Sequence, residues 1–268
     1  MSGHRRFGMK TVWTVLQHAY IWIWLVLFAL PFVATALHSI EAPGGGYSTF
    51  AYSQAFGSFK HSLILSVELT VLAILINLLI AIPAAFAIVR HDIPGKRMIL
   101  SALNLSLYTP AAVMGLGLAI TYAYLLDIPR TRVGLVAAYV VGTFPLMLVP
   151  IIVALRDQPL IYGEAARTLG ANRLQTFFRV ELPLLGPGIS AGVLMTFVIV
   201  FNEFLVTLFI AGPETETAAL RVYNLTKTAG FAQSTAALAT IMQATSFIVV
   251  LLFFKLFSQR YLKGTYFT

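Results

Sequence analysis

The chain contains six long runs of hydrophobic residues that carry no charged side chain or only one. A helix that crosses the roughly 30 Å hydrocarbon core of a bilayer needs about 20 apolar residues, and each run reaches that length. Glu68 interrupts the second run and Glu203 the fifth, and Pro187 between two glycines places the start of the fifth helix near residue 188. We therefore predict six transmembrane helices, over approximately residues 11–37, 61–89, 99–126, 133–155, 188–211 and 235–257.

The composition agrees with a membrane protein and excludes an ordinary soluble enzyme. Only 10% of the residues are charged and 59% are hydrophobic, with a mean hydropathy of +0.85, whereas soluble domains carry about 25% charged residues. The absence of Cys excludes disulfides, Cys-ligated zinc, iron–sulfur clusters and thiol nucleophiles. The net charge of +8 is spread over segments that flank the hydrophobic runs, so it indicates membrane topology rather than nucleic-acid binding.

The distribution of Lys and Arg predicts the orientation. The alternate segments that include both termini hold most of these residues: Arg5, Arg6, Lys10, Arg90, Lys96, Arg97, Arg156, Arg167, Arg173, Arg179, Lys255, Arg260 and Lys263. The opposite segments hold Lys60, Arg130, Arg132, Arg221 and Lys227. We therefore expect both termini in the cytoplasm. A signal peptide is the alternative for the first run, but that run exceeds the 7–15 apolar residues of such a signal. The expected fold is all-α, with one transmembrane domain over residues 1–268.

The predicted cytoplasmic loop, residues 156–187, is long for a link between packed helices. Residues 160–169 favour a short helix that ends at Gly170, with Ala165, Ala166 and Leu169 forming a small apolar strip. A second helix is expected from about Asn172 to Glu181, ending at Leu182-Pro183 because the residue before a proline disfavours helical geometry. An alternative is an amphipathic helix on the lipid headgroups, made basic by Arg167, Arg173 and Arg179.

The spacing in this loop resembles a known signature. The loop contains Glu164-Ala165-Ala166, then three residues, Gly170, nine residues, Val180, one residue and Leu182-Pro183. This spacing is similar to that in the loop of permease subunits in binding-protein-dependent ABC importers, although that family more often has Ile at the position of Val180. Residues 108–115, 202–204 and 211–213 resemble the spermidine/putrescine-type branch, and the likeness covers roughly residues 60–260. It implies a type I importer permease in which Glu164, Ala165, Ala166 and Gly170 dock on an ATPase, while Leu182 and Pro183 fix the loop's return to the membrane.

The resemblance also implies a set of partners: two ATPase subunits, a second homologous permease and an external solute-binding protein, in a bacterial or archaeal cytoplasmic membrane. The chain itself lacks a GxxxxGK[ST] phosphate loop and a HExxH motif, since Gly95-Lys96 is followed by Arg97. We therefore predict a transport subunit with no catalytic residue, metal site or cofactor of its own, while ATP and Mg²⁺ bind the partner ATPases. An ion-coupled secondary transporter and an intramembrane enzyme are the competing classes.

Glu68 and Glu203 are the acidic residues inside the predicted spans. Counting along each helix at 1.5 Å per residue places both roughly 12 Å below the outer surface, with no Lys or Arg expected within reach. Because a charge inside a membrane is costly, such acids suggest a function, here a pathway for a cation such as a polyamine. The alternative is a hydrogen bond to a neighbouring helix, as also expected for Asn77. The predicted pathway residues are Glu203, Asn202, Glu68, Tyr108 and Tyr122, and the alternative solutes are ferric iron, thiamine, opines and phosphonates.

Overall fold

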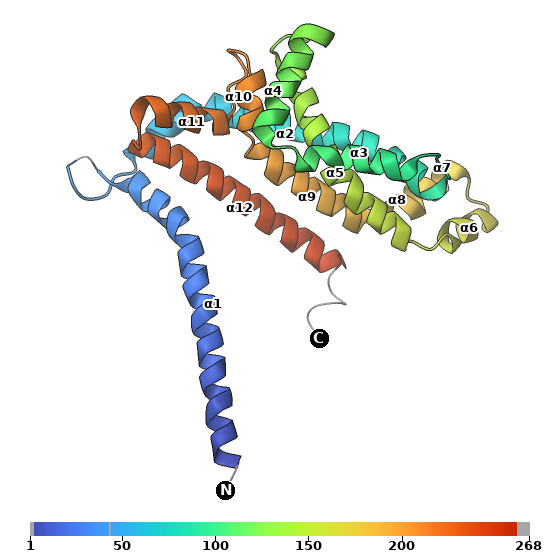
Figure 1. Ribbon diagram of the computed structural model, residues 1–268, viewed down its shortest axis with the longest axis horizontal. Coiled ribbons are helices and arrows are strands. Elements are labelled where there is room, and N and C mark those ends of the chain that lie inside the picture. The colour runs from blue at the N-terminus through green and yellow to red at the C-terminus, as the bar shows by residue number, and fades with distance from the viewer. Residues whose placement is uncertain (1–2, 43, 262–268) are drawn as a thin grey trace.

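The computed structural model describes residues 3–42 and 44–261, and every regular element in these two ranges is helical, as predicted. Figure 1 shows their arrangement. The helices are α1 (Gly3–Ile40), α2 (Phe50–Arg90), α3 (Lys96–Tyr108), α4 (Ala111–Thr121), α5 (Arg132–Asp157), α6 (Ile161–Thr168), α7 (Arg173–Thr176), α8 (Leu182–Leu184), α9 (Gly186–Phe201), α10 (Leu205–Ile210), α11 (Ala218–Ala229) and α12 (Gln233–Tyr261), with two π-helical turns, η1 (Tyr122–Leu126) and η2 (Phe177–Glu181).

Within the described ranges, four helical segments are long and apolar enough to cross a membrane alone. They are Trp13–Ile40, Phe59–Arg90, Arg132–Asp157 and Gln233–Lys255. Two further pairs of helices reach this length only together, because Lys96–Tyr108 and Ala111–Leu126 meet at 109° and Arg173–Leu184 and Gly186–Phe201 meet at 64°. Counting each bent pair as one span gives up to six crossings, the predicted number.

The third predicted span, 99–126, is not one helix. The chain bends at Thr109-Pro110, where Thr109 is extended with ψ of 126°. A proline has no N–H to donate and disfavours helical geometry at the residue before it, so Pro110 ends α3 and starts α4. Consequently α4 projects from the body instead of continuing along α3 (Figure 1).

The core lies where α2, α5 and α9 pack together. Half of the apolar window of α5 is buried in the chain, while none of the window of α1 is. Leu69 and Leu135 belong to one buried cluster of α2 and α5, and Ala85 and Ile151 to a second. Within this core the Asn77 side chain donates to Thr143 Oγ1 at 2.9 Å, which confirms the expected contact between helices.

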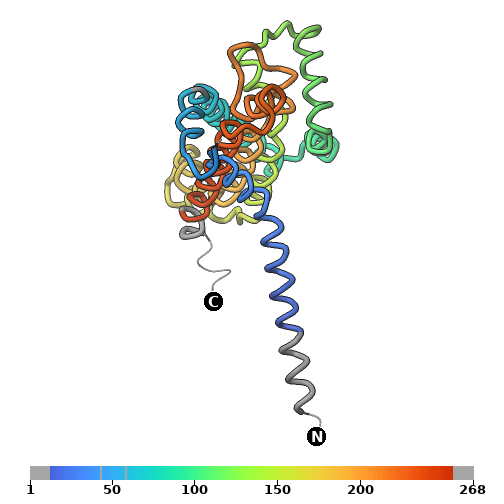
Figure 2. The backbone as a smooth tube through the Cα atoms, turned by 90° about the vertical axis from the view of Figure 1, so that its left-hand side faces the viewer, coloured from blue at the N-terminus to red at the C-terminus, as the bar shows by residue number. Residues whose placement is uncertain are grey.

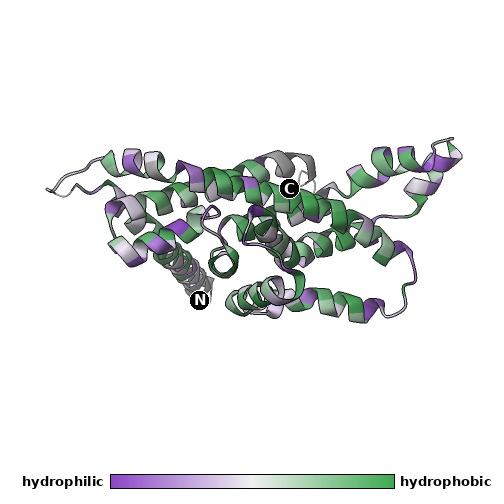
Figure 3. Cartoon of the chain, turned by 90° about the horizontal axis from the view of Figure 1, so that it is seen from above, coloured by the Kyte–Doolittle hydropathy of each residue, from purple (hydrophilic) through white to green (hydrophobic). Residues whose placement is uncertain are grey.

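The first helix leaves the body soon after its attachment point, as Figure 2 shows. His38 Nε2 lies 2.6 Å from the Phe231 carbonyl oxygen, and the Ser39 and Tyr52 hydroxyls are 2.7 Å apart. From Trp13 to Leu30, α1 exposes apolar residues on all sides. Seen from above, most of the length of the helices is hydrophobic and hydrophilic residues gather towards the connections (Figure 3), as expected for a protein in lipid.

Candidate functional site

Two regions at different places in the fold carry the predicted functional residues. The first is loop 156–187, which connects α5 to α9 and lies at one end of the body (Figure 1). Its helix α6 spans Ile161–Thr168, within one residue of the predicted bounds. Gly170 follows the C-cap residue Leu169, and its φ of +91° is in the left-handed region that favours glycine. The prediction of a short helix with a glycine stop is confirmed.

One face of α6 carries three apolar residues at spacings of four, Ile161, Ala165 and Leu169. All three are exposed, with Leu169 at 88%. We call these residues the exposed strip. Glu164 is exposed beside it, whereas Ala166, which the sequence placed in the strip, is half-buried. An apolar face that the chain's own fold leaves uncovered is a candidate surface for another protein.

Gly163 explains how α6 is held against the rest of the loop. A Cβ atom at this position would lie 3.0 Å from Glu181 Oε1 and 3.7 Å from Thr176 Cγ2, so a hydrogen at this position allows α6 to pack closely on α7 and η2. Sequence reasoning did not assign a role to Gly163. The available signal was a glycine inside a helical pattern, which often marks close packing.

The second arm of the loop differs from its prediction. Asn172 and Gln175 form a capping box that starts α7, with hydrogen bonds of 2.8 and 3.0 Å. The predicted stop at Leu182-Pro183 is wrong, because the helical path continues through η2 into α8. Pro183 lies in the first turn of α8, where a missing N–H costs little. Leu182 is half-buried and Pro183 exposed at the point where the loop turns towards α9.

An aromatic contact joins the loop to α2. The ring centroids of Phe177 in η2 and Phe86 in α2 are 5.5 Å apart, and Phe178 packs edge-on against Phe177 at 4.9 Å. Phe86 and Phe177 line an open groove of about 360 Å³ together with Ile82, Pro83, Ala87 and His91. The loop therefore contacts a third span in addition to the two that it connects.

The second region is a break in the fifth predicted span. Helix α9 ends at Phe201 and α10 begins at Leu205, so Asn202, Glu203 and Phe204 interrupt the expected continuous helix over 188–211. Glu203 Oε1 accepts a hydrogen bond from the Val206 N–H at 2.8 Å. A carboxylate at a helix N-terminus satisfies a free backbone donor and is attracted by the helix dipole. The Asn202 side chain donates to the Val198 carbonyl at 2.8 Å and lies 3.5 Å from Ser246 Oγ.

Glu203 also lines a narrow cavity, of about 40 Å³, between α4, α5 and α9. Tyr139, Gly142 and Thr143 of α5 and Met114 of α4 contribute to its wall. Pockets that hold small-molecule ligands typically measure about 300–1,000 Å³, so this space is too narrow for a solute of that kind. Passage of a larger molecule at this level requires the helices around the break to separate.

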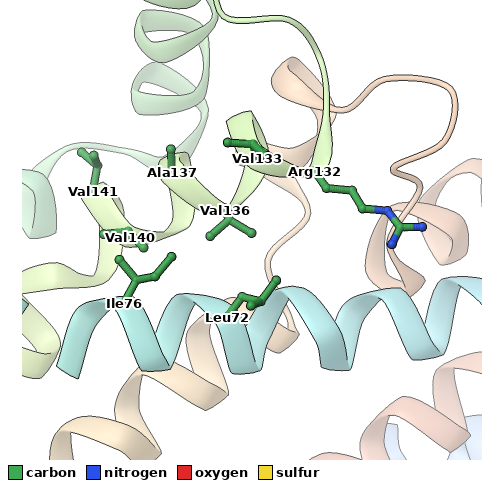
Figure 4. A pocket seen from close by; sticks show the side chains of 8 residues that line it. All are labelled: Leu72, Ile76, Arg132, Val133, Val136, Ala137, Val140 and Val141. Atoms are coloured by element: carbon green, nitrogen blue, oxygen red, sulfur yellow. The ribbon is translucent and has the colours of Figure 1, made fainter. Parts of the chain in front are cut away.

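Glu68 has a basic partner, contrary to expectation. Arg132 Nη1 lies 3.2 Å from both carboxylate oxygens of Glu68, and both side chains are about half exposed. The two residues are 64 positions apart, so counting depth along single helices could not reveal that the long Arg132 side chain reaches α2. Figure 4 shows Arg132 at the end of an apolar groove of about 420 Å³ between α2 and α5, with its guanidinium pointing away from the groove.

The structure does not gather all predicted pathway residues. Glu68 lines a separate groove of about 430 Å³ with Phe201 and Thr245, away from the cavity of Glu203. Tyr122 is buried and its hydroxyl donates to the Gly134 carbonyl at 3.1 Å, so it packs η1 against the start of α5. Tyr108 is 82% exposed at the bend between α3 and α4. Among the described residues no cluster of three His, Asp or Glu could hold a metal ion.

Together these features define a polytopic helical membrane protein whose longest described inter-span loop presents a short helix with an exposed apolar strip. The chain belongs to the family of binding-protein-dependent transport system inner membrane components, which matches residues 77–263. This confirms the resemblance noted in the sequence. The chain is a permease subunit of an ABC importer, and ATP hydrolysis is the task of a separate ATPase subunit.

Curated relatives carry different solutes. The molybdenum transport system permease protein ModB of Escherichia coli K12 is 32% identical over 206 residues, covering 71% of this chain and 90% of the relative. The spermidine/putrescine permease protein PotC of the same strain is 28% identical over 192 residues, covering 72% and 70%. The sulfate permease protein CysW of Synechococcus elongatus is 29% identical over 209 residues, covering 74% and 73%.

Solved structures show the same fold. A bacterial ABC transporter involved in alginate import superimposes with a TM-score of 0.72 at 17% identity, covering 94% of this chain and 98% of the other. The alginate transporter in complex with its pentasaccharide-bound periplasmic protein gives a TM-score of 0.74 at 16% identity, covering 95% and 96%. At this identity the likeness supports the architecture and leaves the solute open.

Proposed function

We propose that this chain is one of two homologous permease subunits in an importer of the cytoplasmic membrane, working with two ATPase subunits and an external solute-binding protein. The distribution of Lys and Arg favours cytoplasmic termini, which places α6 inside and α11 outside. Helices α6 and α11 lie at opposite ends of the body, as expected for segments on opposite sides of the membrane (Figure 1).

The observation that carries the proposal is the exposed strip on α6. Ile161, Ala165 and Leu169 are exposed, whereas Gly163 is buried against Glu181 and Thr176 of the loop's second arm. An apolar face of this kind fits a groove on an ATPase subunit, and ATP and Mg²⁺ bind that subunit. Gly170 ends the docking helix, and Leu182 and Pro183 lead the chain back towards α9.

The test is a substitution in the strip with a control at the same position. Ala165→Glu places a carboxylate in the docked face, where an unpaired buried charge costs at least about 2 kcal/mol, or roughly thirtyfold in ATPase affinity. Ala165→Ser keeps the side chain small and is expected to behave as wild type. Co-purification of the ATPase with each variant measures the effect, and wild-type recovery with Ala165→Glu would reject the docking assignment.

For the solute we propose a small organic cation such as a polyamine. The support is Glu203, a carboxylate at the break of the fifth span that faces a cavity with no basic residue among its lining. Asn202 stands beside it, and Tyr108 is exposed at the bend of the third span. Glu68 no longer supports a cation pathway, because Arg132 neutralises it.

A molybdate-like oxyanion is the second candidate, favoured by the match to the molybdenum permease over 90% of that relative's length. Uptake of putrescine and of molybdate into proteoliposomes containing the complete complex distinguishes the two. For the polyamine assignment, Glu203→Gln is expected to reduce putrescine uptake by far more than uptake of a neutral solute. Equal loss of both, or uptake of molybdate alone, would refute that assignment.

A further inference from the structure

Helix α11 is fixed to the body at its N-terminal end. The Ala218 N–H donates to Ser66 Oγ of α2 at 2.8 Å, and the Thr217 hydroxyl caps the helix. Arg221 pairs with Glu216 at 2.9 Å, and its guanidinium carbon lies 5.2 Å from the centroid of the Phe59 ring. The first turns of α11 are therefore anchored on the neighbouring span.

The other end of α11 is exposed and leads inward through a series of contacts. The Lys227 ammonium lies 4.6 Å from the centroid of the Tyr223 ring, which lies 5.2 Å from the centroid of the Phe204 ring. We call Lys227, Tyr223 and Phe204 the relay residues. Phe204 follows Glu203 directly, so the series ends in the break between α9 and α10.

We propose that an external protein with an acidic contact surface docks on the Lys227 end of α11 and controls the break at 202–204 through the relay residues. The proposal rests on the proposed function, in which this external protein is the solute-binding protein. Arg221 is paired with Glu216, whereas the ammonium of Lys227 is exposed and carries a positive charge at this end of the helix. A carboxylate on the partner complements that charge.

The geometry explains how docking reaches the break. A carboxylate that pairs with Lys227 competes with the face of the Tyr223 ring for the same ammonium. A shift of Tyr223 changes its packing on Phe204, and Phe204 is covalently linked to the residue that caps α10. Because the cavity beside Glu203 is narrow, at about 40 Å³, a movement of the break at this level would change access through the permease.

The experiment uses the complete complex in proteoliposomes and measures ATP hydrolysis with and without the solute-loaded binding protein. Tyr223→Ala and Phe204→Ala are expected to keep basal hydrolysis and to lose at least about fivefold of the stimulation by the binding protein. Tyr223→Phe keeps the ring and is expected to restore stimulation. Phe231→Ala, at an aromatic residue that is 84% exposed on the same side, is the control and should behave as wild type.

Full stimulation in Tyr223→Ala, or an equal loss in Tyr223→Phe, would overturn the relay. If Tyr223→Ala also loses basal hydrolysis, the exposed variant Lys227→Glu decides the question, because the proposal requires it to raise the binding-protein concentration needed for half-maximal stimulation. An unchanged concentration dependence overturns the proposal. A wild-type chain that recruits no ATPase would instead refute the proposed function.

Discussion

The close contact between α5 and α9 gives a prediction whose size follows from the structure. Gly188 lies where α9 crosses α5, and a Cβ atom there would be 2.5 Å from the Pro150 carbonyl oxygen and 2.6 Å from Ala154 Cβ. Optimal contacts between carbon atoms are about 3.5–4.0 Å, so the helices would have to separate by roughly 1 Å. Overpacking of this kind costs about 1–3 kcal/mol, and we expect Gly188→Ala to lose that much unfolding free energy.

The separation would also disturb function, because α5 and α9 hold the two ends of loop 156–187. The matched control is Gly117→Ala in α4, where no atom lies within 4 Å of the added Cβ. This variant is expected to be neutral, or to gain up to about 1 kcal/mol from helix propensity. Denaturant titration of both variants in detergent micelles measures the difference, and coupled ATP hydrolysis in proteoliposomes measures the functional loss.

Equal unfolding free energies for Gly188→Ala and Gly117→Ala would refute the reasoning. That result would mean that α9 does not approach α5 as closely as the structure shows, and the rigid mounting of the loop would then lack a basis.

Two further predictions concern contacts that the sequence did not reveal. Phe177→Ala should reduce solute uptake while ATPase binding stays at the wild-type level, because loss of the Phe86 contact removes about 0.5–1.5 kcal/mol of coupling between the loop and α2. A double-mutant cycle of Phe86 and Phe177 measures this coupling, and additive effects would contradict the contact. Arg132→Gln should destabilise the chain more than the double substitution Arg132→Gln with Glu68→Gln, since the single change leaves an unpaired carboxylate at the membrane. Thermal unfolding of both variants in detergent measures the difference, and equal stability would count against the ion pair.

Local patterns were sufficient to predict the helical class and the short helix of the loop. The six hydrophobic runs follow directly from the apolar length that a bilayer requires, and α6 with its stop at Gly170 follows from helix propensity and a glycine that tolerates positive φ. These features depend on neighbouring residues in the chain, so a single sequence contains the information.

Features that depend on distant partners could not be predicted in the same way. The Arg132–Glu68 ion pair joins two helices whose relative depth is set by packing, and Gly163 has a role only because Glu181 lies against it. The break after Phe201 also escaped prediction, because the surrounding residues are apolar and Glu203 supplies the cap for α10 in place of a typical breaker. Pro110 was visible in the sequence, but the size of the resulting bend was not.

The most direct test of the account is a cross-link from a single cysteine introduced as Ala165→Cys, which the absence of native cysteines makes specific. In the purified complex, a short bifunctional reagent should join this position to the ATPase subunit, and the yield should change when ATP binds. Two results together would contradict the claim that this loop receives the force of ATP hydrolysis. One is the absence of a cross-linked product, and the other is labelling of the introduced thiol by a water-soluble maleimide at the same rate with and without the ATPase.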